Sequence, residues 1–295
     1  MHFDYTTVGH VTADVAADGS QRAGGTAFYS ALQAARLGQR ALIVTKGAPR
    51  EIEELLEPHR GEVELKIHPA DRTTTLQSAG GGEGRTQRML AWAGTIDENV
   101  MIDTAILHLA PVARETPRGW LGRADFVGLT AQGLVRAWEQ DGGEISLVPL
   151  TPAQLPERWD AAVISETERL SCAWLTAPAG RGGSRKARPA GWVRPTETGG
   201  TLVAVTAAQA PTAIHLPDGG IARVEVPAID DFRDDVGAGD VFAAAFFVAL
   251  GEGRSAQAAA AFANAAAAVR IAGDGADAIG DRPAIEARLR AVRSA

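Results

Sequence analysis

The chain has 295 residues, 45% of them hydrophobic and 22% charged, a balance typical of a soluble globular protein. Its formal net charge of −7 argues against a global nucleic-acid-binding surface, and no stretch approaches the roughly 18 uncharged apolar residues of a membrane span. A single cysteine, Cys172, excludes an intramolecular disulfide, and no secretion signal opens the sequence, so we expect a cytoplasmic protein whose partners are small molecules.

Short apolar runs alternate with helical patterns along the chain, which predicts a largely parallel sheet covered by helices. Strands are expected at 5–9, 41–45, 104–110, 125–130, 144–149, 161–165 and 201–206. Helices are expected at 27–37, 49–57 and 131–140, and the chain closes with Ala-rich helices at 239–251, 255–272 and 283–293.

Some segments break this alternation. Residues 73–78 and 84–91 read as two extended stretches joined by glycines, which predicts a hairpin that projects from the sheet. Residues 213–226 predict a second hairpin, with its turn at 217–220. The segment 177–200 is rich in Gly, Pro and Arg and is expected to be a surface loop inside one domain of residues 1–295.

The most informative motif runs from Asp234 to Phe242 and leads into an apolar helix. Gly237 and Gly239 let the backbone turn tightly and approach a ligand, and the helix that begins there directs its free N–H groups at the turn. A carboxylate at Asp240 would lie beside a bound phosphate, where it could take a proton from an attacking hydroxyl. An ordinary glycine-rich helix start, with Asp240 as partner of the helix dipole, explains the same residues.

This motif resembles the second signature of the ribokinase-like (PfkB) carbohydrate kinase family. Gly24-Gly25 followed by Arg36-Leu37-Gly38 resembles the first signature. The resemblance implies a three-layer α/β/α fold with a largely parallel sheet and a small β lid. It also implies ATP-dependent transfer of a phosphoryl group to an alcohol, with Asp240 as the base and the amides of Gly237, Ala238 and Gly239 around the phosphoryl group.

The same resemblance assigns an acceptor side. Gly9 to Asp14 matches the family's first strand, which ends in an aspartate that binds substrate hydroxyls. Only nine residues separate Asp14 from Gly24, so we expect a reduced lid formed mainly by about 12–24 and 70–92. Tyr29 departs from the family, which has Asn there. Further candidates for substrate contacts are Gly24, Gly25, Arg85, Gln87, Arg88, Pro111 and Gln132.

On the donor side the resemblance implies ATP and Mg²⁺. Glu168 matches a glutamate that organises magnesium and its waters, although Ser165 to Glu168 also fits a helix-capping pattern that needs no metal. Asp234 is a possible metal ligand. Thr206, Asn264, Gly273 and Gly275 are expected near the nucleotide. Ala208 and Pro211 replace two family glycines after Thr206, which puts the close approach of backbone to phosphates in doubt there. The arginines of 181–188 could help hold ATP, or form a solvated loop.

Several alternatives stay open at this point. The short lid and Tyr29 favour an inositol-kinase-like member of the family over ribokinase itself, and a nucleoside or a sugar acid could still be the acceptor. A sugar- or nucleotide-binding sensor that has lost turnover would also fit the altered glycines. A small exposed lid sheet could pair with a second lid, so a homodimer is possible.

Overall fold

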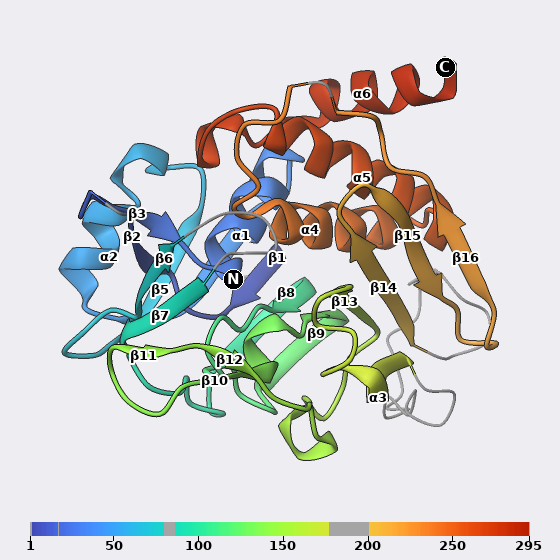
Figure 1. Ribbon diagram of the computed structural model, residues 1–295. Helices are drawn as coiled ribbons and strands as arrows, with labels where there is room; N and C mark the ends of the chain where they lie inside the picture. The colour runs from blue at the N-terminus through green and yellow to red at the C-terminus, as the bar shows by residue number, and fades with distance from the viewer. Residues whose placement is uncertain (1, 17, 80–85, 177–200, 230, 295) are drawn as a thin grey trace.

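The computed structural model describes residues 2–16, 18–79, 86–176, 201–229 and 231–294. Its centre is a nine-stranded sheet in the order β16-β15-β14-β13-β9-β8-β1-β4-β5 (Figure 1). Seven neighbouring strands are parallel: β1 (Phe3–Val8), β4 (Ala41–Gly47), β5 (Glu64–Pro69), β8 (Met101–Leu109), β9 (Leu121–Thr130), β13 (Ala161–Ser165) and β14 (Leu202–Ala207). The sequence predicted the parallel sheet and six of these strands, but it missed β5. The predicted second hairpin adds β15 (Ala210–His215) and β16 (Ile221–Val224) as antiparallel strands at one edge.

Helices cover one face of this sheet. They are α1 (Thr26–Arg36), α4 (Ala238–Gly251), α5 (Ala256–Ile271) and α6 (Arg282–Ser294), which lie together above the sheet in Figure 1. Helix α4 is buried from Val241 to Leu250 because α1 and α5 pack on it from outside, and this explains why it is apolar all round. The Ala-rich sequence of α5 lets the two helices approach closely. The short α2 (Pro49–Leu55) connects β4 to β5.

The opposite face carries a second hydrophobic cluster that includes Val127, Ile164 and Val203. Among the described residues its cover is mostly irregular chain, with the short α3 (Ala173–Thr176) as its helix. The helix expected at 131–140 is wrong: residues Gln132–Val135 form one 3-10 turn, and β10 (Arg136–Ala137) follows it. The strand expected at 144–149 is also wrong, because β11 (Gly143–Glu144) and β12 (Ser146–Leu147) lie outside the main sheet.

A second, five-stranded sheet lies over the carboxyl ends of the main strands. Its order is β11-β7-β6-β2-β3, with β2 (Thr12–Val15), β3 (Gln21–Gly24), β6 (Thr75–Ala79) and β7 (Thr86–Ala91). Strands β6 and β7 are the predicted projecting hairpin. The strand order of the main sheet reverses at β1, and the chain enters β2 directly after β1. Ligands of open parallel sheets bind at such a switch point.

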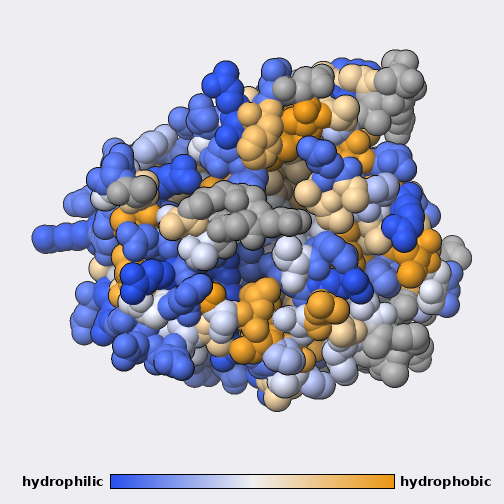
Figure 2. All heavy atoms as spheres, viewed as in Figure 1, coloured by the Kyte–Doolittle hydropathy of each residue, from blue (hydrophilic) through white to orange (hydrophobic). Residues whose placement is uncertain are grey.

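The distribution of hydrophobic and polar residues on the surface agrees with the globular composition of the sequence. On the face shown in Figure 2 most residues are hydrophilic, and the hydrophobic ones form small groups separated by polar side chains. In the described part of the chain, no helix combines the length and the apolar character that crossing a bilayer requires.

Candidate active site

A pocket of about 220 Å³ lies between the small sheet and the amino-terminal end of α4. Side chains and backbone from β2, α1, β7, the turn after β9 and the 235–240 segment line it. Eight of its lining residues were expected from the sequence: Asp14, Gly25, Tyr29, Gln87, Gln132, Gly237, Gly239 and Asp240. Residues more than 200 positions apart in the chain therefore line one pocket.

The turn before α4 has the backbone shape that its glycines predict. Gly237 has φ of 80°, and a Cβ there would lie 2.4 Å from the Tyr29 ring, so only glycine fits. One expectation needs correction: the amide of Ala238 donates to the carbonyl of Asp235 at 3.1 Å and is not free for a phosphate. Gly239 and Asp240 follow in the first turn of α4, where backbone N–H groups have no carbonyl one turn earlier in the helix to bond. These two N–H groups can bind an anion at the helix end.

Asp240 lies in the first turn of α4 and lines the pocket. Burial of its carboxyl group raises its pKa from 3.8 to about 7, and the charges of Glu168 and Asp14 act in the same direction. The nearby Thr26 hydroxyl and the Arg136 guanidinium lower the pKa again in part. A carboxylate with a pKa near neutrality is well suited to accept and release a proton at physiological pH.

Asp14 faces the same pocket from β2. The Thr12 hydroxyl donates to its Oδ1 at 2.7 Å, which orients the carboxylate. On the neighbouring strand a Cβ at Gly24 would lie 2.2 Å from Asp14 Oδ2, so this glycine makes room for the acid. Gly25 has φ of 93° and begins α1. The diglycine therefore positions Asp14 and lets the chain turn into the helix that carries Tyr29.

Sequence reasoning missed a buried cation in the pocket. Arg136 is 6% exposed and donates to the carbonyl of Val112 at 3.0 Å and to Oε1 of Gln87 at 2.7 Å. Gln87, one of three candidates in the hairpin, thus points toward the pocket, whereas Arg88 donates to the carbonyl of Gly142. The signal for Arg136 was hidden because its segment was read as a helix. Arg85 lies outside the described residues.

Thr26 was also missed, although it directly follows the diglycine. It is 1% exposed, lines the pocket and lies near enough to Asp240 to lower the pKa of that acid. A hydroxyl at the first residue of a helix that follows Gly-Gly was the signal that could have identified it.

On the donor side, Glu168 forms the capping arrangement that the sequence allowed. Its Oε2 accepts from the Ser165 amide at 2.9 Å, and its own amide lies 3.3 Å from the Ser165 hydroxyl. Glu168 is 6% exposed. Burial lowers the pKa of Arg136 and raises the pKa of Asp240, and the charge of Glu168 opposes the first shift and adds to the second. Thr206 lies beside Ser165 in the next strand, outside the pocket lining. The basic residues of 181–188 lie outside the described part of the chain.

The remaining donor-side candidates have partners inside the protein. Asn264 is 4% exposed, accepts from the Thr212 hydroxyl at 2.8 Å and donates to the carbonyls of Val224 and Glu225, so its amide group joins α5 to the second hairpin. Asp234 pairs with Arg270 at 2.9 Å. The carboxylate of Asp234 is thus engaged in an ion pair, and its role as a possible metal ligand stays a prediction.

Gly273 and Gly275 belong to a loop fastened to the 234–236 segment. The carbonyl of Gly273 accepts from Arg270 at 3.1 Å, and the amide of Gly275 donates to Asp234 at 3.3 Å. These two glycines therefore bond to residues next to the turn that begins α4. Neither of them lines the pocket of about 220 Å³.

Residues 192–281 match the pfkB family carbohydrate kinase model. No curated protein sequence matches the chain. Among solved structures, a pyrophosphate-dependent kinase of the ribokinase family, complexed with a pyrophosphate analog and myo-inositol, is 20% identical with a TM-score of 0.71, covering 96% of this chain and 99% of its own. Arabidopsis thaliana ribokinase with ribose and ATP is 19% identical (TM-score 0.71; 98% and 99% covered), and Methanocaldococcus jannaschii nucleoside kinase is 14% identical (TM-score 0.72; 98% of each chain). The predicted ribokinase-like fold and the resemblance to this family are confirmed.

Proposed function

We propose that this chain, with its ribokinase-like fold and its pfkB carbohydrate kinase match, transfers the γ-phosphoryl group of ATP to an alcohol of a small polyhydroxy compound. The observation that carries the proposal is the carboxyl group of Asp240, which has a pKa of about 7 and lies in a pocket directly at the amino-terminal end of α4. A base and a phosphate-binding helix end are the two parts that phosphoryl transfer to a hydroxyl requires.

The pocket favours a small, uncharged acceptor. Its volume of about 220 Å³ is below the roughly 300–1,000 Å³ of drug-sized ligand sites, so a single sugar or cyclitol ring fits better than a nucleoside. Asp14 and Asp240 face the buried Arg136 across it, so the described lining residues carry no excess positive charge for a sugar acid. Asp14 accepts hydrogen bonds from acceptor hydroxyls, as a carboxylate on a polyol does.

In the reaction, Asp240 takes the proton of the acceptor's hydroxyl group while the oxygen of that hydroxyl group bonds to the γ-phosphorus. The bond from that phosphorus to the bridging oxygen breaks, and ADP leaves with the electron pair. The amides of Gly239 and Asp240 donate hydrogen bonds that stabilise the negative charge on the transferred phosphoryl group.

Magnesium fits this site only through the donor. In the described part of the chain no group of three or more His, Cys, Asp or Glu side chains could hold a metal. Glu168, buried near Arg136 and Asp240, is the residue that would hold the metal's water shell, while donor phosphates supply direct ligands. Bound magnesium supplies neutralisation of phosphate charge.

A specific observation favours pyrophosphate as a second candidate donor. The expected nucleotide contacts are reduced: β14 turns directly into β15 through Ala208, at φ of 46°, and the amide group of Asn264 is engaged inside the protein. A donor without adenosine needs neither contact.

A donor and acceptor matrix tests both candidates. ATP and pyrophosphate, each with magnesium, are combined with a panel of cyclitols, aldoses, ketoses, sugar acids and nucleosides, and phosphorylated product is measured by mass spectrometry. Product from one ring-sized neutral acceptor is expected. Absence of product with every combination, together with measurable acceptor binding, would favour the sensor alternative.

A further inference from the structure

Arg270 is the largest fully buried side chain among the described residues. It stands in the last turn of α5 and has no measurable exposure, although its guanidinium keeps its positive charge in proteins. Burying a charge without partners costs several kcal/mol, so the groups around it show what holds it there.

The partners of Arg270 come from two segments at the end of the helices. Its Nη2 donates to the Val236 carbonyl at 2.6 Å and to the Asp234 carboxylate at 2.9 Å. Its Nη1 donates to the carbonyls of Asp234 at 3.3 Å and Gly273 at 3.1 Å. Three carbonyl oxygens and one carboxylate therefore converge on a cation that belongs to the chain itself.

One of these bonds holds the peptide that leads into the proposed phosphate site. The peptide that joins Val236 to Gly237 is planar and trans, so its carbonyl and its N–H point in opposite directions. With the Val236 oxygen held on the Arg270 side, the N–H of Gly237 is fixed on the other side. Val236 and Gly237 both line the pocket, and Gly237 leads directly into the first turn of α4, where the amides of Gly239 and Asp240 form the proposed anion site.

Tyr29 supports the same turn from α1. Its ring would contact any Cβ at Gly237, and its centre lies 5.8 Å from the guanidinium carbon of Arg270. The turn is therefore held between an aromatic ring and a buried cation, two supports that belong to the chain itself.

We infer that Arg270 is a positioning residue: a built-in cation that holds the 234–237 backbone so that the amides at the start of α4 are preorganised for the donor phosphate. The expected effect on turnover rests on the proposed function. The expected effect on the order of the 234–237 backbone does not. Because the converging carbonyls already bind a guanidinium, added potassium should change wild-type turnover less than twofold.

The test compares Arg270→Lys, Arg270→Ala and a control, Arg254→Met. Lysine keeps the charge but cannot reach all four acceptors, and alanine leaves room for a guanidinium ion. Arg254 precedes the other end of α5 and pairs with Glu252, so its loss should leave turnover unchanged. For Arg270→Lys we expect kcat to fall at least tenfold and the donor KM to rise, with the acceptor KM within about threefold. Guanidinium chloride at tens of millimolar should restore part of the Arg270→Ala activity.

Two readouts separate this inference from the proposed reaction. Hydrogen exchange of the peptide spanning 234–241 should be at least fivefold faster in Arg270→Lys than in wild type, whether or not any acceptor is phosphorylated. Calorimetric titration with magnesium pyrophosphate and magnesium ATP should show weaker binding. A folded Arg270→Lys protein with wild-type exchange and wild-type donor affinity would overturn the inference, even if Arg270→Ala failed to fold. Wild-type protein without turnover, but with the exchange difference, would sink only the proposed reaction.

Discussion

Asp240 is an acid whose surroundings oppose its ionisation, although the proposed reaction needs the ionised form. Burial raises its pKa to about 7, while Arg136 and Thr26 keep it from rising further. Each neighbour thus adjusts the fraction of enzyme that carries a usable base at a given pH.

Replacing Asp240 by Asn tests that role. The amide keeps the size of the side chain but cannot accept the acceptor's proton, so kcat should fall about 10²–10⁴-fold. In wild type, kcat should rise with pH through an apparent pKa near 7, because the group must lose its proton to act. Steady-state kinetics from pH 5 to 9 check both points. A well-folded variant with wild-type turnover would contradict the assignment.

Asp14 should control the acceptor and not the donor. Asp14→Asn removes the charge that strengthens hydrogen bonds to hydroxyls, each worth about 1.5–3 kcal/mol. The acceptor KM should therefore rise at least tenfold, while the donor KM stays within about twofold. Asp71→Asn, at an exposed position, is the matched control. An unchanged acceptor KM would remove Asp14 from the site.

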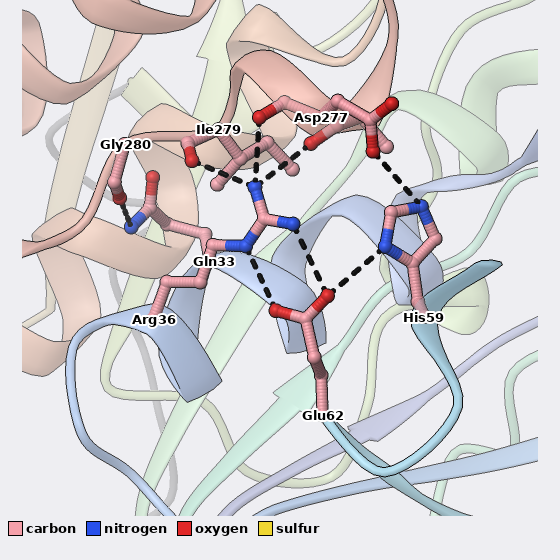
Figure 3. A network of polar contacts seen from close by, with 8 residues as sticks. Gln33, Arg36, His59, Glu62, Asp277, Ile279 and Gly280 are labelled. Carbon is pink, nitrogen blue, oxygen red and sulfur yellow. Dashed lines mark hydrogen bonds and ion pairs between the residues drawn. The ribbon is translucent and has the colours of Figure 1, made fainter.

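At the scale of elements, the loop after α5 is held by two arginines. Arg270 holds it from inside, and Arg36 of α1 donates to the carbonyls of Ala276, Asp277 and Ile279 (Figure 3). Arg36 also forms a two-bond ion pair with Glu62, and His59 contacts the same carboxylate. Arg36, the arginine of the first sequence motif, thus joins α1, the segment just before β5 and the loop after α5.

Arg36→Met should destabilise the fold by about 2–3 kcal/mol, because it leaves three carbonyls and a carboxylate without their charged donor. Arg40 forms a more exposed pair with Glu64, and Arg40→Met should cost less than about 1 kcal/mol. Urea unfolding of the two variants gives the comparison. Equal losses would mean that the carbonyl contacts of Arg36 contribute little.

Local patterns predicted most elements but not the contacts between distant ones. The motif at 234–242 was readable because its glycines, helix start and acid lie within nine residues. The error at 131–140 has a physical cause: the segment has helix-forming residues, but Arg136 is held by Gln87 and Val112, which the local sequence does not reveal. Arg270 was hidden in the same way, since its partners lie 34 to 36 positions upstream or in the following loop.

For the molecule as a whole, the site has a stability cost that depends on pH. The folded state binds a proton at Asp240 up to about pH 7, whereas an ordinary aspartate releases it near 3.8. Between these values the folded state holds more protons than the unfolded state, so this group makes stability fall as pH rises. His108 acts in the opposite direction, because burial between Tyr5 and Thr130 lowers its pKa to about 3 and keeps it neutral.

The difference between wild type and Asp240→Asn isolates the first effect, since His108 is common to both proteins. At pH 4 both carry a neutral side chain at position 240, and their stabilities should be similar. Toward pH 7 the variant should become the more stable by about 2–4 kcal/mol, because one pKa unit corresponds to about 1.4 kcal/mol, and the gap should stay constant above pH 8. Thermal and urea unfolding at pH 4, 6 and 8 measure it, with Asp71→Asn as control. If this difference in the free energy of unfolding shrinks with rising pH, the fold stabilises the ionised form of Asp240. Its pKa would then not be raised, which would contradict its proposed role as a base that titrates near neutral pH.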